Sequence, residues 1–77
     1  MPRYFFDVHD GIDVRDEVGR ELEDNDAILQ AEALQVVTEL MKAEAADAKE
    51  TALILTVRDK NGGIAFRVRL ICQVERS

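Results

Sequence analysis

The residues of this sequence that are best suited to acid–base chemistry or metal binding are His9 and two nearby aspartates, Asp7 and Asp10. An imidazole beside a carboxylate can act as a general base, and both groups can bind a transition metal. A zinc site, however, usually needs three or four nitrogen or sulfur ligands, and His9 is the only histidine in the chain. We therefore expect His9 to be an exposed side chain at the end of a β-strand, with no catalytic or metal-binding role.

A run of acidic residues follows in DVRDEVGRELEDND, which spans residues 13–26. Carboxylates around a loop glycine could bind Ca²⁺, but the spaced aspartates and terminal glutamate of an EF-hand loop are missing. Helix capping explains the end of the run better, because Asp24, Asn25 and Asp26 can each accept hydrogen bonds from the first backbone N–H groups of a helix. The sequence thus predicts a solvated loop that leads into a helix.

The single cysteine, Cys72, has no second cysteine with which to form an intrachain disulfide or a metal site. Alternation places Cys72 on the inward face of the last predicted strand, where a thiol is most often a small core side chain. Gly62-Gly63 belongs to a turn and does not form a phosphate-binding loop. We expect no enzyme activity, no cofactor and no metal.

A candidate partner surface combines three arginines and three apolar residues that alternation places on the outer face of a β-sheet. Its members are Phe5, Ile54, Arg58, Arg67, Arg69 and Ile71. Arginine beside an aromatic ring on a sheet is one way in which proteins bind single-stranded RNA. The alternative is that these arginines pair with Asp7 across the strands. The net charge of −6 makes nucleic acid the less favoured partner.

The hydrophobic pattern predicts two β-hairpins, one on each side of a single helix. Alternation marks strands at residues 3–9, 12–15, 51–58 and 64–74. Asp10-Gly11 and Asn61-Gly62 supply tight turns, because glycine accepts the positive φ that such turns need. Residues 16–24 are expected to form a loop. The predicted fold is α+β: a two-layer β-β-α-β-β arrangement with a four-stranded antiparallel sheet, strand order 2-1-3-4, and one long helix packed on one face.

The predicted helix extends from Ala27 to about Lys49, a segment without glycine or proline. Its apolar side chains cover about half of the circumference, which is wider than the roughly 100° stripe that contacts a single sheet. A candidate dimer face consists of Leu29, Ala33, Val36 and Leu40. We expect the surplus apolar surface to bind a second copy of the chain.

Composition narrows the class of protein further. With 77 residues, of which 47% are hydrophobic and 34% charged, the chain is predicted to form one small domain over residues 1–77. Tyr4-Phe5-Phe6 is interrupted by Asp7 before a signal-peptide core develops, and no apolar run approaches the about 20 residues that cross a bilayer. A single cysteine suits a reducing compartment. We expect a cytoplasmic protein without a membrane partner.

The opening MPRYFFDVHDG, the RDEVGRELED loop and the helix start DAILQAEAL together resemble a family of small bacterial proteins of unknown function. The resemblance covers Met1 to about Ala45, and the second hairpin is similar in pattern only. Glu23-Asp24 stands where the family usually has Pro-Asp, which affects only the rigidity of the loop. A more distant similarity is to HicB-like antitoxins, although their attached DNA-binding segment has no counterpart here. The resemblance implies no established activity and no catalytic residues.

Two functions from different classes remain open. The leading hypothesis is a non-enzymatic protein-interaction module that self-associates, most simply as a homodimer, and that can also bind another protein. The alternative is an antitoxin-like or RNA-binding regulator that uses Arg58, Arg67 and Arg69 on the outer sheet face.

Overall fold

The computed structural model describes residues 1–45 and 50–75. In this part of the chain the elements follow in the order β1 (Arg3–His9), β2 (Asp13–Val14), β3 (Arg20–Glu21), α1 (Asp26–Ala45), β4 (Glu50–Asp59) and β5 (Ile64–Gln73). The predicted α+β class is confirmed. The predicted last residues of the helix, 46–49, lie outside the described residues.

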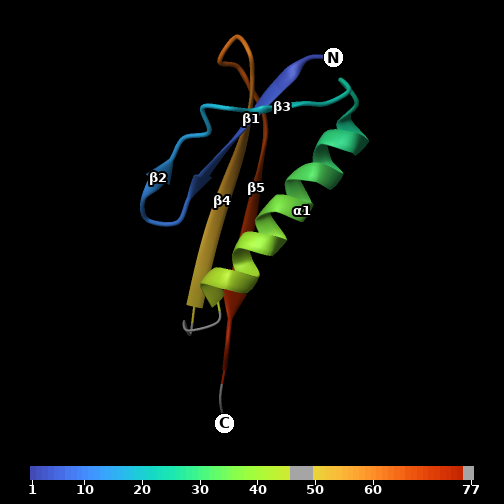
Figure 1. Cartoon of the computed structure of the whole chain (residues 1–77). Helices are drawn as coiled ribbons and strands as arrows, with labels where there is room; N and C mark the ends of the chain where they lie inside the picture. Colours follow the sequence, from blue (N-terminus) through green and yellow to red (C-terminus); the bar gives the residue numbers. More distant parts are fainter. Residues whose placement is uncertain (46–49, 76–77) are drawn as a thin grey trace.

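All of these strands join one antiparallel sheet, whose longest pairings are those of β4 with β1 and with β5. The path β2-β1-β4-β5 corresponds to the predicted order 2-1-3-4. The predicted strand count is wrong, because the expected loop at residues 16–24 contains β3, which also pairs with β1. β2 and β3 therefore follow each other along one edge of β1, while β5 forms the opposite edge of the sheet (Figure 1).

The two predicted tight turns adopt a backbone conformation that favours glycine. Gly11, between β1 and β2, has a φ of 105°, and Gly62, between β4 and β5, has a φ of 85°. At the second turn the Asp59 carboxylate accepts hydrogen bonds from the amides of Asn61 and Gly63, both at 2.9 Å. These local interactions close the two hairpins that the sequence predicts.

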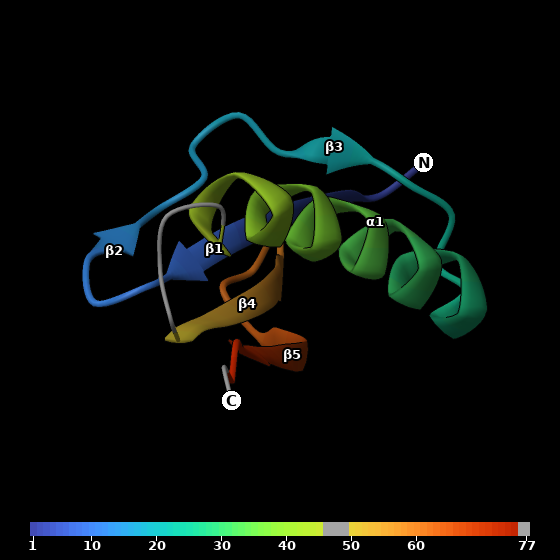
Figure 2. The same cartoon turned by 90° about the horizontal axis from the view of Figure 1, so that it is seen from below.

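The helix begins at a side-chain cap and packs on one face of the sheet. The Oδ1 atom of Asn25 accepts hydrogen bonds from the amides of Ala27 and Ile28, at 3.0 and 3.2 Å. From there α1 runs alongside β4 and β5 and covers their inner face (Figure 2). No helix of the described residues is long and apolar enough to cross a membrane.

The buried core lies between α1 and the strands β1 and β4. Its members are Leu29, Ala33, Val37 and Met41 on the helix, and Tyr4, Phe6, Leu53, Leu55 and Val57 on the strands. On β5, by contrast, the inward row is only partly buried, although it packs against the same core. This row consists of Phe66, Val68, Leu70 and Cys72. The inward position predicted for Cys72 agrees with this packing, and the core thins toward the β5 edge.

The chain is elongated for its length. Its extents are 49 × 24 × 16 Å, and its Cα radius of gyration is 13.5 Å, whereas a compact chain of 77 residues has about 11.5 Å. Its accessible surface is 5604 Å², compared with about 4,700 Å² for a typical monomer of 8.7 kDa. The fold thus leaves roughly 900 Å² more surface in contact with solvent than a chain of this mass usually does.

Candidate interaction surface

His9 lies exposed at the end of β1, where neither Asp7 nor Asp10 contacts its ring. Its Nδ1 atom is instead 2.5 Å from Oδ1 of Asp13 on β2, and the side chain of Asp13 is 88% exposed. The Asp10 carboxylate accepts a hydrogen bond from a backbone amide of the turn. Among the residues that the structure describes, no three side chains of the histidine, cysteine and acidic types gather as metal ligands. The arrangement is that of a solvated cross-strand pair at a strand end.

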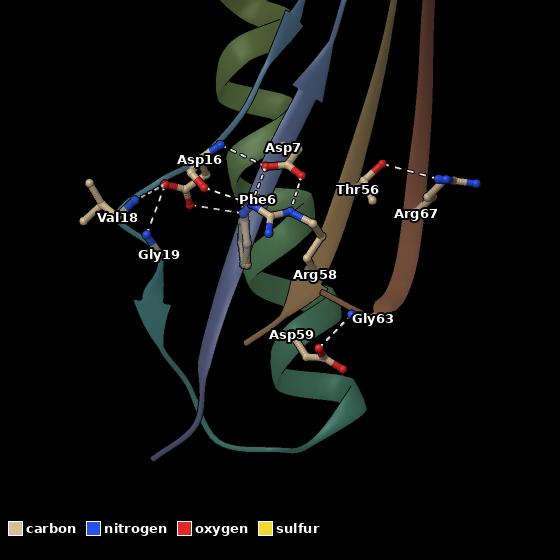
Figure 3. A network of polar contacts seen from close by, with 10 residues as sticks. All are labelled: Phe6, Asp7, Asp16, Val18, Gly19, Thr56, Arg58, Asp59, Gly63 and Arg67. Carbon is tan, nitrogen blue, oxygen red and sulfur yellow. Dashed lines mark hydrogen bonds and ion pairs between the residues drawn. The ribbon is translucent and has the colours of Figure 1, made fainter. Parts of the chain in front are cut away.

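Asp7 forms an ion pair with Arg58 across β1 and β4 (Figure 3). The Nε atom of Arg58 donates to Oδ2 at 2.5 Å and one Nη atom donates to Oδ1 at 3.2 Å. Burial acts to raise the pKa of Asp7, but the hydrogen bonds from Arg58 and from the Asp16 amide outweigh it and hold the pKa below its ordinary value. The guanidinium also lies 4.9 Å from the Phe5 ring centroid. Cross-strand pairing with Asp7 is therefore confirmed for Arg58.

The acidic loop is held to β1 by the carboxylate of Asp16. It accepts hydrogen bonds from the amides of Phe6 at 3.1 Å, Val18 at 3.0 Å and Gly19 at 3.1 Å (Figure 3). Burial acts to raise the pKa of Asp16, but these amides outweigh it and lower the pKa. Phe6 lies between the parts of β1 that pair with β2 and β3. Between these two paired parts of β1, the Asp16 carboxylate accepts the hydrogen bond from the Phe6 amide that a neighbouring strand carbonyl would otherwise accept.

The predicted partner surface divides into a half-buried part and an exposed part. Phe5, Ile54 and Arg58, on β1 and β4, are half-buried, whereas Arg67, Arg69 and Ile71 are exposed and all lie on β5. Arg67 donates a long hydrogen bond of 3.4 Å to the hydroxyl of Thr56. Ile71 has an exposed fraction of 69%. The exposed part of the predicted surface therefore lies entirely on β5.

A shallow hollow of about 370 Å³ lies on the outer sheet face, where its lining includes His9, Asp13, Asp7 and Arg58. These four residues form two pairs, His9 with Asp13 and Asp7 with Arg58. These four charged side chains are therefore bound in pairs that join neighbouring strands, and Arg15 is a further charged residue of the lining.

The predicted dimer face of the helix is turned toward the chain's own sheet. Leu29 and Ala33 are buried, and Val36 and Leu40 pack partly against the same core. The sequence overestimated the surplus apolar surface, because the twisted sheet covers more of the helix than a narrow stripe. The large apolar residues that stay exposed on α1 are Ile28, at 39%, and Leu34, at 41%.

A groove of about 560 Å³ lies between α1 and β5. It is lined by Asp26, Gln30 and Leu34 from the helix and by residues 65–69 from β5. β5 pairs with β4 on one side, and no other described strand pairs with its opposite side. An edge strand with free N–H and C=O groups can accept another strand. The groove, the partly buried apolar row and the open edge together form one continuous candidate surface, which we call the β5 edge surface.

The sequence of β5 contains information about its edge that the hydrophobic pattern does not include, namely which edge-protecting features are present. Exposed edges are commonly protected by charged side chains, by proline, by a bulge in mid-strand or by an inward-pointing charge. Ile64–Gln73 has no proline, and its two arginines, Arg67 and Arg69, both point outward. Its one irregularity lies at the turn end, opposite Val57 and Arg58. The two outward arginines are the edge charges of its central part, and its inward row, Phe66, Val68, Leu70 and Cys72, carries no charge. A strand of this length is suited to pairing with a partner that neutralises those arginines.

Three comparisons with known proteins were informative about the family of the chain only. A search of the curated proteins and a search of the solved structures find no match. The profile of one family matches residues 3–71, which include all of β1 and most of β5. The expected membership of a family of unknown function is thereby confirmed, whereas the similarity to HicB-like antitoxins stays a prediction. The chain belongs to the family described as domain of unknown function DUF6894.

Proposed function

We propose that this chain is a non-enzymatic protein-interaction module that self-associates through the β5 edge surface. The observation that carries the proposal is the combination of an open strand edge with an inward apolar row that α1 covers only in part. Each Å² of apolar surface that a partner removes from water contributes about 25 cal/mol. A partner that covers Phe66, Val68 and Leu70 therefore gains the burial that the single chain leaves incomplete.

The amount of surplus surface supports a partner of ordinary interface size. The chain exposes roughly 900 Å² more than a typical monomer of its mass. A standard protein interface buries about 800 Å² on each partner. The surplus is therefore sufficient for one such interface.

The proposal is tested by measuring the mass of the chain in solution as its concentration increases. Sedimentation velocity from low micromolar to several hundred micromolar should show the mass rise from 8.7 kDa toward twice that value. Leu34→Lys, which places a charge in the groove, should shift the association to higher concentration. Val18→Lys is the matched control, because Val18 is 77% exposed in the loop before β3. A chain that stays monomeric over the whole range contradicts self-association.

The antitoxin-like or RNA-binding regulator is retained as a second candidate because Arg67 and Arg69 are both exposed on β5. Arg58, the third arginine of that hypothesis, is bound to Asp7 inside the protein. Two exposed arginines on an acidic chain supply little of the phosphate neutralisation that drives nucleic-acid binding. For this reason we rank self-association first.

A further inference from the structure

We infer that two copies of the chain join edge to edge through β5, in an antiparallel register that places Ile71 opposite Ile71 of the second copy. The inference rests on the proposed self-association, and it adds the contact strand, the symmetry and the register. It predicts one continuous sheet across both chains, with both helices on the same face.

The symmetry follows from the identity of the two edges. Two copies that meet through the same strand are related by a two-fold axis, which makes the two β5 strands antiparallel. Directly opposite residues then point to the same side of the sheet. The inward row that includes Phe66, Val68 and Leu70 therefore continues into the same row of the second copy, beneath both helices.

The charges on the outer face of β5 exclude two registers. If Arg69 lies opposite itself, two guanidinium groups meet at the axis. If Val68 lies opposite itself, Arg67 faces Arg69 twice. Like charges directly opposite each other destabilise a strand pair. Both registers are therefore less stable than one in which the arginines face neutral or acidic residues.

In the register centred on Ile71, each arginine lies opposite an acidic or a neutral residue of the second copy. This register places Arg67 opposite Glu75 of the second copy, and Arg69 opposite Gln73, on each side of the axis. Glu75 is exposed, and it is the last described residue. A register centred on Leu70 also avoids like charges, but it pairs Arg67 with Gln73 and forms no ion pair. The two Arg67–Glu75 pairs and the burial of Ile71, which is 69% exposed, favour the first.

The same register places an apolar residue of the second copy, Val74, at the groove between α1 and β5. Val74 directly follows β5, which ends at Gln73, and is 46% exposed. In the register centred on Ile71, Val74 of the second copy lies opposite Val68, which lines the groove beside Leu34. An inward-pointing valine there covers the exposed side of Leu34. Two residues that are exposed apolar groups in the single chain thus become part of one interface.

Exchange of charges tests the register. Arg67 lies on β5 and Glu75 lies two residues beyond its end. In an extended chain this separation of eight residues spans about 27 Å, so the two side chains form no ion pair within one chain. Arg67→Glu and Glu75→Arg should each weaken dimerisation about tenfold, because each replaces two ion pairs with two repulsive pairs. The double variant Arg67→Glu/Glu75→Arg should restore dimerisation to near the parent level. Both substituted positions are exposed, so the circular dichroism spectra of all three variants should match that of the parent.

Cysteine cross-linking gives an independent measurement, made in a Cys72→Ser background. Ile71→Cys should form an interchain disulfide under mild oxidation, because opposite residues have Cα atoms about 5 Å apart. Arg69→Cys is the matched control, since its two copies lie about 13 Å apart in this register. Cross-linking at Arg69→Cys but not at Ile71→Cys overturns the register.

The outcomes separate the two proposals. A dimer that shows both the charge rescue and the Ile71→Cys cross-link supports the inference. A dimer that shows neither overturns the register centred on Ile71 while self-association stands. A chain that stays monomeric at every concentration overturns both.

Discussion

The Asp7 carboxylate and the Arg58 guanidinium are 51 residues apart in sequence and meet at 2.5 Å between β1 and β4. This pair joins the N-terminal hairpin to the C-terminal hairpin on the outer face of the sheet. It also removes Arg58 from the set of arginines that are free to bind a partner. Of the three arginines on the outer face, only Arg67 and Arg69 therefore remain exposed, both on β5.

Stability should depend on acidic pH through Asp7 and Asp16. Both carboxyls have a pKa below their ordinary value of 3.8 in the folded chain. Such groups contribute stability that is fully present above the unfolded pKa and is lost as the pH falls through the folded pKa. We expect the melting temperature to be nearly constant above about pH 5 and to fall below about pH 4. The Asp16→Asn variant should have a lower melting temperature than the parent near neutral pH. Its melting temperature should also fall by less than that of the parent when the pH is lowered.

Thermal melts followed by circular dichroism between neutral pH and strong acid measure this effect. Glu17→Gln is the control, because it removes an exposed acid from the same loop. If Asp16→Asn and Glu17→Gln have the same pH profile, the carboxylate of Asp16 does not hold the loop.

Gly19 should be the glycine at which alanine is most damaging. Its φ is +74°, and a Cβ atom at this position would lie 2.9 Å from the Tyr4 carbonyl oxygen and 2.9 Å from Cε1 of Phe5. Gly11 also has a positive φ, of +105°, but nothing lies within 4 Å of the place of its Cβ. We expect Gly11→Ala to lower the free energy of unfolding by about 1 kcal/mol. Gly19→Ala should lower it by about 2–3 kcal/mol. Urea unfolding distinguishes the two, and equal losses would contradict close packing of the loop on β1.

The two faces of the sheet should respond differently to truncation. Leu55 on β4 is fully buried, so Leu55→Ala should reduce the free energy of unfolding by about 2–5 kcal/mol. Ile71 on β5 is 69% exposed. At concentrations where the chain is a monomer, Ile71→Ala should therefore change the free energy of unfolding by no more than about 0.5 kcal/mol. Chemical denaturation at low micromolar concentration provides this comparison. A large loss at Ile71 would show that the outer face is covered within one chain.

The three arginines of the regulator hypothesis should prove inequivalent. Arg58→Ala should lower the melting temperature, because it leaves the Asp7 carboxylate without its partner. Arg67→Ala/Arg69→Ala should leave the melting temperature unchanged. We expect this double variant and the parent to bind single-stranded RNA equally weakly in fluorescence anisotropy at physiological salt. A salt-dependent loss of RNA binding in the double variant would favour the regulator over the interaction module.

The sequence predicted those features that depend on local geometry. The turn glycines Gly11 and Gly62, the cap at Asn25 and the alternation of β4 each act over a few residues, and the structure contains all of them. The short strand β3 was missed because Arg20–Glu21 has no hydrophobic alternation. It is a strand because tertiary contacts bring the loop against β1, among them the hydrogen bonds of the Asp16 carboxylate, the close approach of Gly19 and the ion pair of Glu21 with Arg3.

The interaction surface was predictable in part. Outward alternation correctly placed Arg67, Arg69 and Ile71 on one exposed strand face. The helix face was misjudged, because the angular width of an apolar sector does not reveal how far a twisted sheet wraps around it. Leu29 and Ala33 are covered, whereas Leu34 is left open at the groove. The predicted order 2-1-3-4 places residues 64–74 at an edge of the sheet, and β5 lies at the end of the observed strand path. No local pattern shows how much of the inward row of β5 the helix leaves uncovered.

The two edges of the sheet are not equivalent, and this difference limits the stoichiometry of any assembly. β2, β3 and the Asp16 carboxylate occupy the hydrogen-bonding groups along the β1 edge. Open-ended growth into a fibre needs two adhesive edges on each copy, one to receive a neighbour and one to extend from it. A chain with a single adhesive edge is saturated by its first partner. If the chain self-associates through β5 as proposed, the acidic loop blocks the second route of growth along β1, and the assembly would stop at two chains.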